Sequence, residues 1–310
     1  MVEYTEEIIK TRKVICKHCG GTNIHKVGNK NEIQYFRCNN CKKKFADNNA
    51  YLGMRYPQDC NIKALTYYYN GMSYKNINHT FNDLYGYNFP KSTIWRWLMK
   101  FSKMVNKYVL TLHPKLSDIW IADETAVFIF GKQYWYWDII DTKSRFLIAT
   151  HLSKTRTLKD AKKFFYMAKL RSKTRPKIIR TDKLQGYHTA FNKVFYSNIK
   201  ERRVTHLTSE GFNSPTNINL IERFHGTLKQ RTKVMRNLKT KDSARITLDG
   251  YITHYNFFLE HSYLGGITPA MAGGIGNDIY NWGDLIELSY NTPIKNPEVR
   301  LEWEEEFTVN

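Results

Sequence analysis

Three consecutive apolar segments place the strongest constraint on how this chain can fold. They span residues 119–130, 132–141 and 145–153, and they are rich in β-branched and aromatic residues. The short sequences GK and TKS between them are typical of tight turns. The pattern therefore predicts three strands that follow one another along the chain and pair antiparallel.

Helical and strand patterns alternate in the region that follows. The expected helices are 157–173, 184–196, 217–236 and 242–261, and the expected strands are 176–182 and 203–209. Antiparallel strands followed by such an alternation give a mixed sheet flanked by helices. We therefore predict an α/β fold for residues 116–275, with an RNase H-like mixed five-stranded sheet.

Two aspartates end strands that are neighbours in a sheet of this kind. Asp123 follows the apolar run IWIA, and Asp182 ends the run KIIRTD. The first and fourth strands lie side by side in an RNase H-like sheet, so both carboxylates are expected at one edge, where a helix carrying Glu222 can add a third. Converging carboxylates suit two Mg²⁺ or Mn²⁺ ions. Such an ion pair activates the attacking oxygen and stabilises the leaving oxygen of a phosphodiester.

Each acid also has a simpler interpretation. Asp123 competes with Glu124, because strand alternation sends the two side chains to opposite faces, and only one of them can then join the site. Asp182 is a common type of N-cap residue for a following helix. Glu222 can be an ordinary solvated charge on a helix.

The predicted helix at 217–236 is amphipathic. Its apolar face carries Leu220, Ile221, Phe224, Leu228 and Met235, and its opposite face carries Glu222, Lys229, Lys233 and Arg236. A surface glutamate in a basic helix is usually stabilised by a lysine or arginine three or four positions further on. Glu222 has His225 and Gly226 at those positions. We therefore expect Glu222 to bind metal and the basic residues beyond it to bind phosphates.

Four of the five cysteines form two C-x-x-C pairs. The pairs are Cys16 with Cys19 and Cys38 with Cys41, and 18 residues lie between them. This spacing is typical of one structural Zn²⁺ held by four thiolates. His18 and His25 lie close by in sequence, but we expect neither to be a ligand, and we expect Cys60 to be a small buried residue. Because residues 1–50 can bury little core, the ion should hold this zinc ribbon together.

Residues 57–110 form a second module. Gly71, Gly86 and Pro90 divide it into three helix-sized pieces, and Ser73 and Ser92 stand at N-cap positions. Three short helices with a glycine turn between the first two are typical of a helix-turn-helix domain. The third helix would then enter the major groove of DNA with Lys91, Ser92, Thr93 and Arg96 at its leading end. The alternative is a helical linker domain with Trp95, Trp97, Leu98 and Phe101 as its core.

The charge of the chain indicates a polyanionic partner. The 310 residues carry a formal net charge of +20, and the pI is near 9.6. Nucleic acid is the leading partner for such a surface, ahead of an anionic membrane. Residues 276–310 form an acidic C-terminal tail, which we expect to be a solvated end. Neither a membrane-spanning run nor a signal peptide is recognisable, so we expect a cytoplasmic, nucleoid-associated protein.

Several segments together resemble the DDE transposases of prokaryotic insertion sequences, which are relatives of retroviral integrases with an RNase H-like core. The segments are IADET, IIRTDK, IERFHGTLKQRTKVMR and HYNFFLEHSYLGGITPAMAGGI, and the resemblance covers about residues 118–275. Asp123, Asp182 and Glu222 match the catalytic triad. Lys229 matches the basic residue that commonly follows the glutamate by seven positions and contacts the end of the element. The 39 residues between Asp182 and Glu222 exceed the common spacing, which leaves the subfamily open.

The resemblance implies a two-step reaction on double-stranded DNA. Water cleaves the phosphodiester at the terminal inverted repeats, and the freed 3′-hydroxyl then attacks target DNA. Asp123, Asp182 and Glu222 would hold the two ions, and Lys229, Lys233 and His225 would position the DNA. Two ends must be handled together, so a homodimer or larger assembly is expected.

Three other functions are consistent with parts of the sequence. A transposase-derived DNA-binding regulator without catalytic activity would keep the two N-terminal modules, but all three acids are present. A plain RNase H-like nuclease would leave those modules unexplained. A tyrosine recombinase needs a catalytic basic pair, and the chain has no H-x-x-R sequence to supply it.

Overall fold

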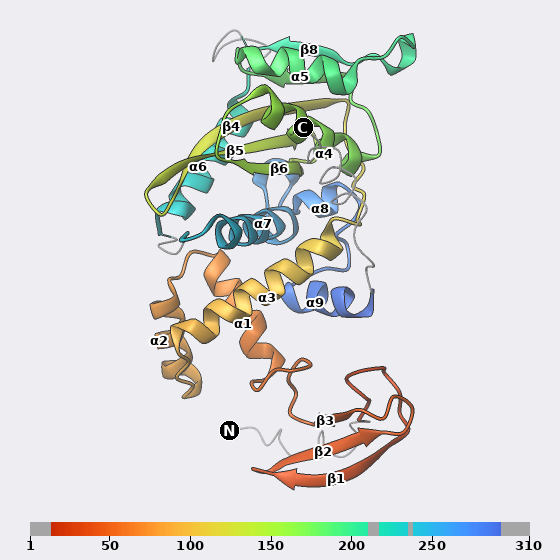
Figure 1. Ribbon diagram of the computed structural model, residues 1–310, viewed down its shortest axis with the longest axis vertical. Helices are drawn as coiled ribbons and strands as arrows, with labels where there is room; N and C mark the ends of the chain where they lie inside the picture. Colours follow the sequence, from red (N-terminus) through yellow and green to blue (C-terminus); the bar gives the residue numbers. More distant parts are fainter. Residues whose placement is uncertain (1–13, 210–216, 235–237, 293–310) are drawn as a thin grey trace. The chain divides into compact units, whose positions relative to one another are not determined.

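The computed structural model describes residues 14–209, 217–234 and 238–292 of the chain (Figure 1). It divides into two compact units, residues 1–63 and 64–310, and each unit is considered by itself below. Nowhere in the described ranges is there a helix with both the length and the apolar character needed to cross a membrane.

The N-terminal unit is built on a three-stranded antiparallel sheet. Strands β1 (Ile24–Lys30), β2 (Ile33–Cys38) and β3 (Lys44–Ala46) pair in sequence order. The small core between them consists of Cys16, Phe36, Cys38 and Phe45, with Val14, Ile24 and Cys41 packed against it. Half of the four central residues are therefore cysteines, so there is little apolar packing besides the stack of the two phenylalanine rings.

Three helices follow, divided at the positions that the sequence predicts. They are α1 (Gln58–Tyr69), α2 (Tyr74–Tyr85) and α3 (Lys91–Val109). Ser73 caps α2 as expected, since its side chain accepts a hydrogen bond from the Asn76 amide, and α2 ends at Gly86 in the left-handed conformation that glycine favours.

The predicted N-cap at Ser92 is wrong. The N-cap of α3 is Pro90, whose carbonyl already accepts from the Thr93 amide at 2.8 Å, so Ser92 lies within the first turn. A proline fits this position because its fixed φ suits the extended N-cap conformation. Trp97 is buried as core, whereas Trp95 is 39% exposed, so the core interpretation holds for only one of the two tryptophans.

A mixed five-stranded sheet forms the centre of the second unit, as predicted. The strands are β4 (Ile119–Ile129), β5 (Lys132–Asp141), β6 (Leu147–Ser153), β7 (Ile178–Thr181) and β8 (Thr205–Thr208), in the order β6-β5-β4-β7-β8. β4, β5 and β6 are antiparallel, and β7 runs parallel to both β4 and β8. The first and fourth strands of the sheet are therefore direct neighbours, which is the arrangement on which the predicted acidic site depends.

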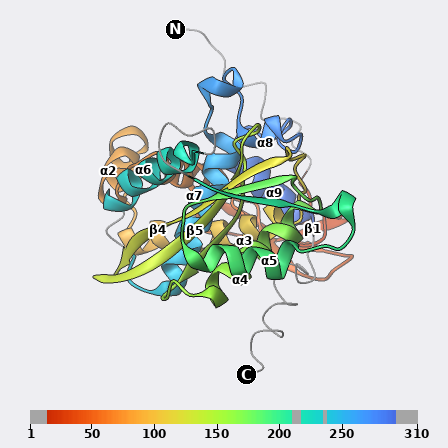
Figure 2. The same cartoon turned by 90° about the horizontal axis from the view of Figure 1, so that it is seen from above.

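Helices cover both faces of this sheet (Figure 2). α4 (Leu158–Ser172) and α5 (Gln185–Phe195) lie on one face, and α6 (Asn219–Val234) and α7 (Lys241–Phe258) lie on the other. Trp137 points toward the first pair of helices, where its ring is tilted against that of Phe164 and edge-on to that of Tyr187. Its neighbour Asp138 faces α6, because side chains alternate along a strand. Short 3₁₀ helices occur at Lys200–Arg202 and Ser262–Leu264.

The C-terminal segment differs from the predicted solvated tail. After the short α8 (Pro269–Ala272), residues 282–291 form α9 (Trp282–Asn291), which packs against α3. Trp282 is 1% exposed and stacks on Tyr69 with ring centroids 5.1 Å apart. Trp282, Leu285 and Ile286 share one face of α9 and are all buried, so this part of the segment belongs to the core. The acidic run at 302–307 lies outside the described residues.

Candidate active site and metal centres

Three carboxylates meet where β7 ends beside its neighbour β4, a place called here the β4–β7 edge. Asp123 is on β4, Asp182 directly follows the last residue of β7, and the last paired positions of the two strands are Ile121 and Arg180. Oxygen atoms of Asp123, Glu124 and Asp182 lie within 4.8 Å of one another. The predicted approach of Asp123 to Asp182 is thus present, and it results from the parallel pairing of the two strands.

Glu124 joins this cluster although strand alternation was expected to exclude it. Its side chain is fully buried, its Oε2 accepts a hydrogen bond from the Tyr187 hydroxyl of α5, and its Oε1 pairs with Arg156. Asp182 lies beyond the end of β7, so its carboxylate is not confined to one face of the sheet and lies close to acids from both faces. Strand alternation does hold, since Asp123 contacts His225 of α6 and Glu124 contacts Tyr187 of α5, but both carboxylates come close to Asp182. Which of the two belongs to the metal site stays a prediction.

Arg156 enters the cluster from the segment between β6 and α4. Its Nη2 atom pairs with Glu124 and lies 3.5 Å from Asp182 Oδ2, and its guanidinium carbon lies 4.7 Å from the centre of the Trp135 ring. Arg156 was not predicted from the sequence, because a single arginine ahead of a helix carries no pattern. Only the packing of β4, β5 and α4 brings it to the acids.

His225 of α6 contacts acids on two adjacent strands, β4 and β5. Its Nε2 is 2.9 Å from Asp138 Oδ2 on β5, and its Nδ1 is 3.5 Å from Asp123 Oδ2 on β4. Asp123 and Asp138 are paired residues on adjacent strands. With 6% exposure, His225 is buried against these two acids, so the prediction that it contacts DNA directly is wrong.

Burial disfavours the charged forms of the acids at this edge. Burial raises the pKa of Asp123 to about 7, with a further increase from Glu124 and an opposing effect of His225. Burial also raises the pKa of Asp138 to about 6. Burial alone would lower the pKa of His225, but its contacts with Asp138 and Asp123 outweigh this and raise it. Crowded, desolvated carboxylates are a donor set that fits a hard divalent cation.

Glu222 lies on the exposed side of α6, three residues before His225. Within the described ranges it is not one of the acids that lie within 4.8 Å of one another. Ile221, Phe224 and Leu228 are buried on the opposite side, as the helical periodicity predicts. Glu222 lies almost one helical turn before His225, the residue of α6 that contacts Asp123. Its role as a ligand remains a prediction.

The basic residues of α6 that the structure describes differ in exposure. Lys229 and Lys233 are exposed, as expected, and Arg236 lies outside the described residues. Arg231 is buried, donates a hydrogen bond to the Tyr68 carbonyl and lies over the Tyr68 ring at 4.8 Å. It therefore joins α6 to α1. The expected leading end of α3 is open, since Lys91, Ser92 and Arg96 are exposed and Thr93 is half-buried.

The cysteines of the N-terminal unit form a second cluster of ligands. The four sulfur atoms lie within 4.8 Å of one another, with Cys16 Sγ 3.6 Å from Cys41 Sγ and Cys19 Sγ 3.5 Å from Cys38 Sγ. A tetrahedral zinc site with Zn–S bonds of about 2.3 Å has sulfur atoms about 3.8 Å apart, so the cluster fits Zn²⁺. His18 and His25 are outside it and contact Lys44 and Asn39 instead.

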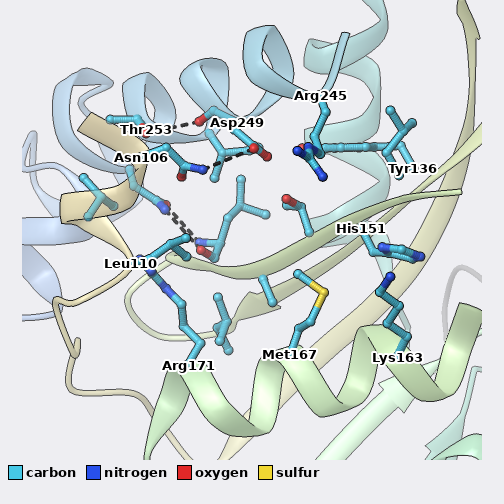
Figure 3. A pocket seen from close by; sticks show the side chains of 18 of the residues that line it. Asn106, Leu110, Tyr136, His151, Lys163, Met167, Arg171, Arg245, Asp249 and Thr253 are labelled. Carbon is cyan, nitrogen blue, oxygen red and sulfur yellow. Dashed lines mark hydrogen bonds between the residues drawn. The ribbon is translucent and has the colours of Figure 1, made fainter. Parts of the chain in front are cut away.

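A cavity of about 150 Å³ lies elsewhere in the second unit, between α3, α4, β6 and α7 (Figure 3). Arg171 and Arg245 line this cavity, together with apolar residues such as Leu110 and Met167. None of the three clustered acids lines it. The carboxylate edge, and not this cavity, is therefore the candidate active site.

The strand order β6-β5-β4-β7-β8, with three antiparallel strands followed by two parallel ones and acids at the β4–β7 edge, defines the RNase H-like class of fold. Solved structures with low similarity include the integrase catalytic core of HTLV-2 in complex with magnesium, at a TM-score of 0.40 and 17% identity over 52% of this chain and 99% of that one. An intasome chain of simian T-cell lymphotropic virus matches 52% of this chain and 56% of its own length, at a TM-score of 0.36 and 20% identity.

Similarity to known proteins is also found at the level of sequence. Residues 117–261 match the family model described as a DDE domain. The transposase for insertion sequence-like element IS431mec of Staphylococcus aureus is 27% identical over 197 residues, which cover 63% of this chain and 83% of the relative. The transposase for insertion sequence element IS257 in transposon Tn4003, also from S. aureus, has the same identity and coverage. Over these residues the chain is similar to the DDE transposases of insertion sequences.

Proposed function

We propose that this transposase binds the terminal inverted repeats of its insertion sequence, cleaves the DNA ends and joins each freed 3′-hydroxyl to target DNA. The observation that carries the proposal is the approach of Asp123 and Asp182 at the β4–β7 edge, within a segment that matches a DDE domain. We assign residues 116–275 to the catalytic core, 1–50 to a zinc ribbon and 57–110 to a helix-turn-helix domain.

Asp123, Asp182 and Glu222 are the proposed ligands of two Mg²⁺ or Mn²⁺ ions. When bound, such ions lower the pKa of the attacking hydroxyl or water and neutralise charge on the leaving oxygen. The protein residues hold this arrangement in place. His225 keeps the Asp123 carboxylate oriented through its contact at 3.5 Å, and Asp138 fixes the ring of His225 from the other side.

The proposed DNA contacts lie on two helices of the second unit. On α6, Lys229 and Lys233 are exposed beyond Glu222 and can pair with phosphates near the cleaved bond. On α3, the proposed recognition residues are Lys91, Ser92, Thr93 and Arg96. Arg96 donates hydrogen bonds to the Ser92 carbonyl and the Thr93 hydroxyl, so reading a base requires that it leave these intrahelical contacts.

Cys16, Cys19, Cys38 and Cys41 are the proposed ligands of one structural Zn²⁺. The spacing of their sulfur atoms supports this proposal. We further propose that the transposase works as a homodimer or larger assembly, because two DNA ends are joined to one target.

The test is Asp182→Asn in the full-length protein. The variant should lose strand transfer by at least about 1000-fold, since one carboxylate ligand is removed, while its affinity for a terminal-repeat duplex stays unchanged. Asp118→Asn is the matched control, because Asp118 is an exposed acid at the start of β4 whose partner is Lys177. Wild-type rates of transfer by Asp182→Asn would refute the assignment. Specific end binding by the wild type without any transfer would instead indicate a DNA-binding regulator.

A further inference from the structure

Among the described residues, Arg156 is the arginine that forms ion pairs with acids of the carboxylate cluster, and the resemblance to known families assigns it no role. We propose that Arg156 binds the phosphodiester that is being cleaved or joined, and that Glu124 is its anchor and not a metal ligand. This inference rests on the proposed function, because the phosphodiester is that of the DNA substrate.

Both oxygens of Glu124 already have partners. Oε2 accepts the hydrogen bond of Tyr187, and Oε1 pairs with Arg156. The Glu124 side chain is 0% exposed, whereas the side chains of Asp123 and Asp182 are 13% and 32% exposed. A metal ion entering from solvent therefore meets Asp123 and Asp182 first, while the charge of Glu124 is neutralised by a guanidinium that is already in contact with it.

The guanidinium is held in a defined plane. Its carbon lies 4.7 Å from the Trp135 ring centre, and a guanidinium has five N–H donors arranged in a flat fork. Both ion pairs with the acids use the same atom, Nη2. The Arg156 side chain is 35% exposed, so an oxyanion can approach the fork from the solvent side. A phosphate oxygen is the ligand for which this fork is suited, and a lysine could not reproduce its geometry.

The backbone on both sides of Arg156 is fixed. Ser153 Oγ accepts a hydrogen bond from Trp137 Nε1 at 2.7 Å and donates to the Thr155 carbonyl at 2.6 Å. On the other side, the hydroxyls of Thr155 and Thr157 both donate to Asp160 Oδ2 at 2.7 Å. The arginine is therefore positioned before substrate arrives, which is the condition under which a donor stabilises a transition state most effectively.

Arg156 forms two ion pairs, and binding of the phosphodiester replaces the longer one, which is with Asp182. Nη2 lies 3.5 Å from Asp182 Oδ2, while the pairing with Glu124 and the stack on Trp135 are independent of Asp182. When Asp182 takes part in holding a cation, Arg156 remains attached to Glu124 at the border of the site. Its other N–H groups then face a phosphate that lies between the metal ligands and the solvent.

The activity test compares Arg156→Ala and Arg156→Lys with Arg145→Ala. Arg145 is the matched control because its guanidinium also lies over an aromatic ring, that of Tyr263 at 3.8 Å, but away from the acids. Arg156→Ala should lower the rate constant of strand transfer about 100-fold, and Arg156→Lys should recover little of it, as expected for the loss of an oriented donor. Wild-type transfer by Arg156→Ala would overturn the proposal.

A second readout is independent of catalysis. Binding of a terminal-repeat duplex is measured without divalent metal at several salt concentrations, and the slope of log K against log salt should fall by about 0.9 in Arg156→Ala but not in Arg145→Ala. If the wild type carries out no transfer, the proposed function fails, yet the slope still reports on the phosphate contact. An unchanged slope in Arg156→Ala would overturn that contact.

The role of Glu124 is tested by Mn²⁺ titration of the full-length protein. Glu124→Gln should bind Mn²⁺ about as tightly as the wild type, whereas Asp182→Asn should bind it much more weakly. Tyr187→Phe, which removes one hydrogen bond to Glu124 and leaves its charge, serves as a second variant if Glu124→Gln does not fold. A loss of Mn²⁺ affinity in Glu124→Gln equal to that in Asp182→Asn would show that Glu124 is a ligand and would overturn its role as an anchor.

Discussion

The two ligand clusters of this protein are related to their folds in opposite ways. In the N-terminal unit, Cys16 and Cys38 are at once candidate zinc ligands and half of the central core residues. At the β4–β7 edge, Asp123 and Asp182 lie beside a core of fully buried residues such as Trp120 and Phe164. In the first case the ligands hold the fold, and in the second case the fold holds the ligands.

The electrostatic consequences differ as well. A structural site of four thiolates is closed, since every coordination position is taken by the protein. The acidic edge is open, and its carboxylates are kept together against their mutual repulsion by the surrounding packing. Burial raises the pKa of Asp123 to about 7, which shows that the sheet forces this group into an environment that disfavours its charge.

Removal of zinc should have the largest effect. In the full-length protein, chelation or Cys38→Ser should unfold the β1–β3 sheet, because zinc binding contributes on the order of 10 kcal/mol to the folding of such small units. Amide hydrogen exchange should show loss of protection for residues 24–46 only. Cys60→Ser is the control, since Cys60 is outside the cluster. Retained protection after zinc is removed would contradict the comparison.

Asp182→Asn should leave stability unchanged or slightly higher. The substitution removes one of three neighbouring negative charges, and asparagine can still accept the hydrogen bond that Asp182 Oδ1 receives from the Leu184 amide at 2.9 Å. We expect a shift in the free energy of unfolding of no more than about 1 kcal/mol, measured by denaturant titration without divalent metal. A large loss of stability would mean that the acids support the fold as the cysteines do.

Metal binding at the acidic edge should depend on pH around neutrality. Asp123 has to lose its proton before it binds a cation, so Mn²⁺ affinity should fall up to about tenfold for each pH unit below 7, as titration calorimetry can measure. The stability of the metal-free protein should change with pH in the opposite direction to the Mn²⁺ affinity. The pKa of Asp123 is raised from 3.8, so its contribution to the stability of the metal-free protein is fully present below pH 3.8 and is lost as the pH rises to about 7. If the Mn²⁺ affinity of Asp123→Asn depended on pH as steeply as that of the wild type, the prediction would be contradicted.

Substitution of the exposed lysines of α6 should have the smallest effect. Lys229→Ala and Lys233→Ala should each weaken binding of a terminal-repeat duplex a few-fold and reduce the salt slope by about 0.9, because each removes one phosphate contact. Thermal stability should not change, since both side chains are exposed. Lys132→Ala in the β4–β5 turn is the control. Equal effects of the control would mean that general charge, and not the position on α6, determines binding.

The sequence by itself determined those features that depend on local pattern. Apolar runs rich in β-branched and aromatic residues predicted the five strands, turn sequences predicted where the first three end, and helical spacing of apolar residues predicted the helices. The C-x-x-C spacing predicted the approach of four thiolates. Asp123 and Asp182 were found because each follows an apolar run that predicts a strand, although Asp123 lies within β4 and only Asp182 follows the end of its strand.

Only the tertiary structure decided which side chains complete the site. Arg156, Tyr187 and Asp138 come from three separate elements, and no local period relates them to Glu124 or His225. His225 was expected to contact DNA because the helix pattern cannot show that a histidine beside the apolar face lies over two buried acids. The packing of α9 was missed for the same reason, since the acidic charge of the C-terminal segment concealed the apolar face that Trp282 presents to the core. Contacts between distant residues are set by how elements pack, and that information is distributed over the whole chain.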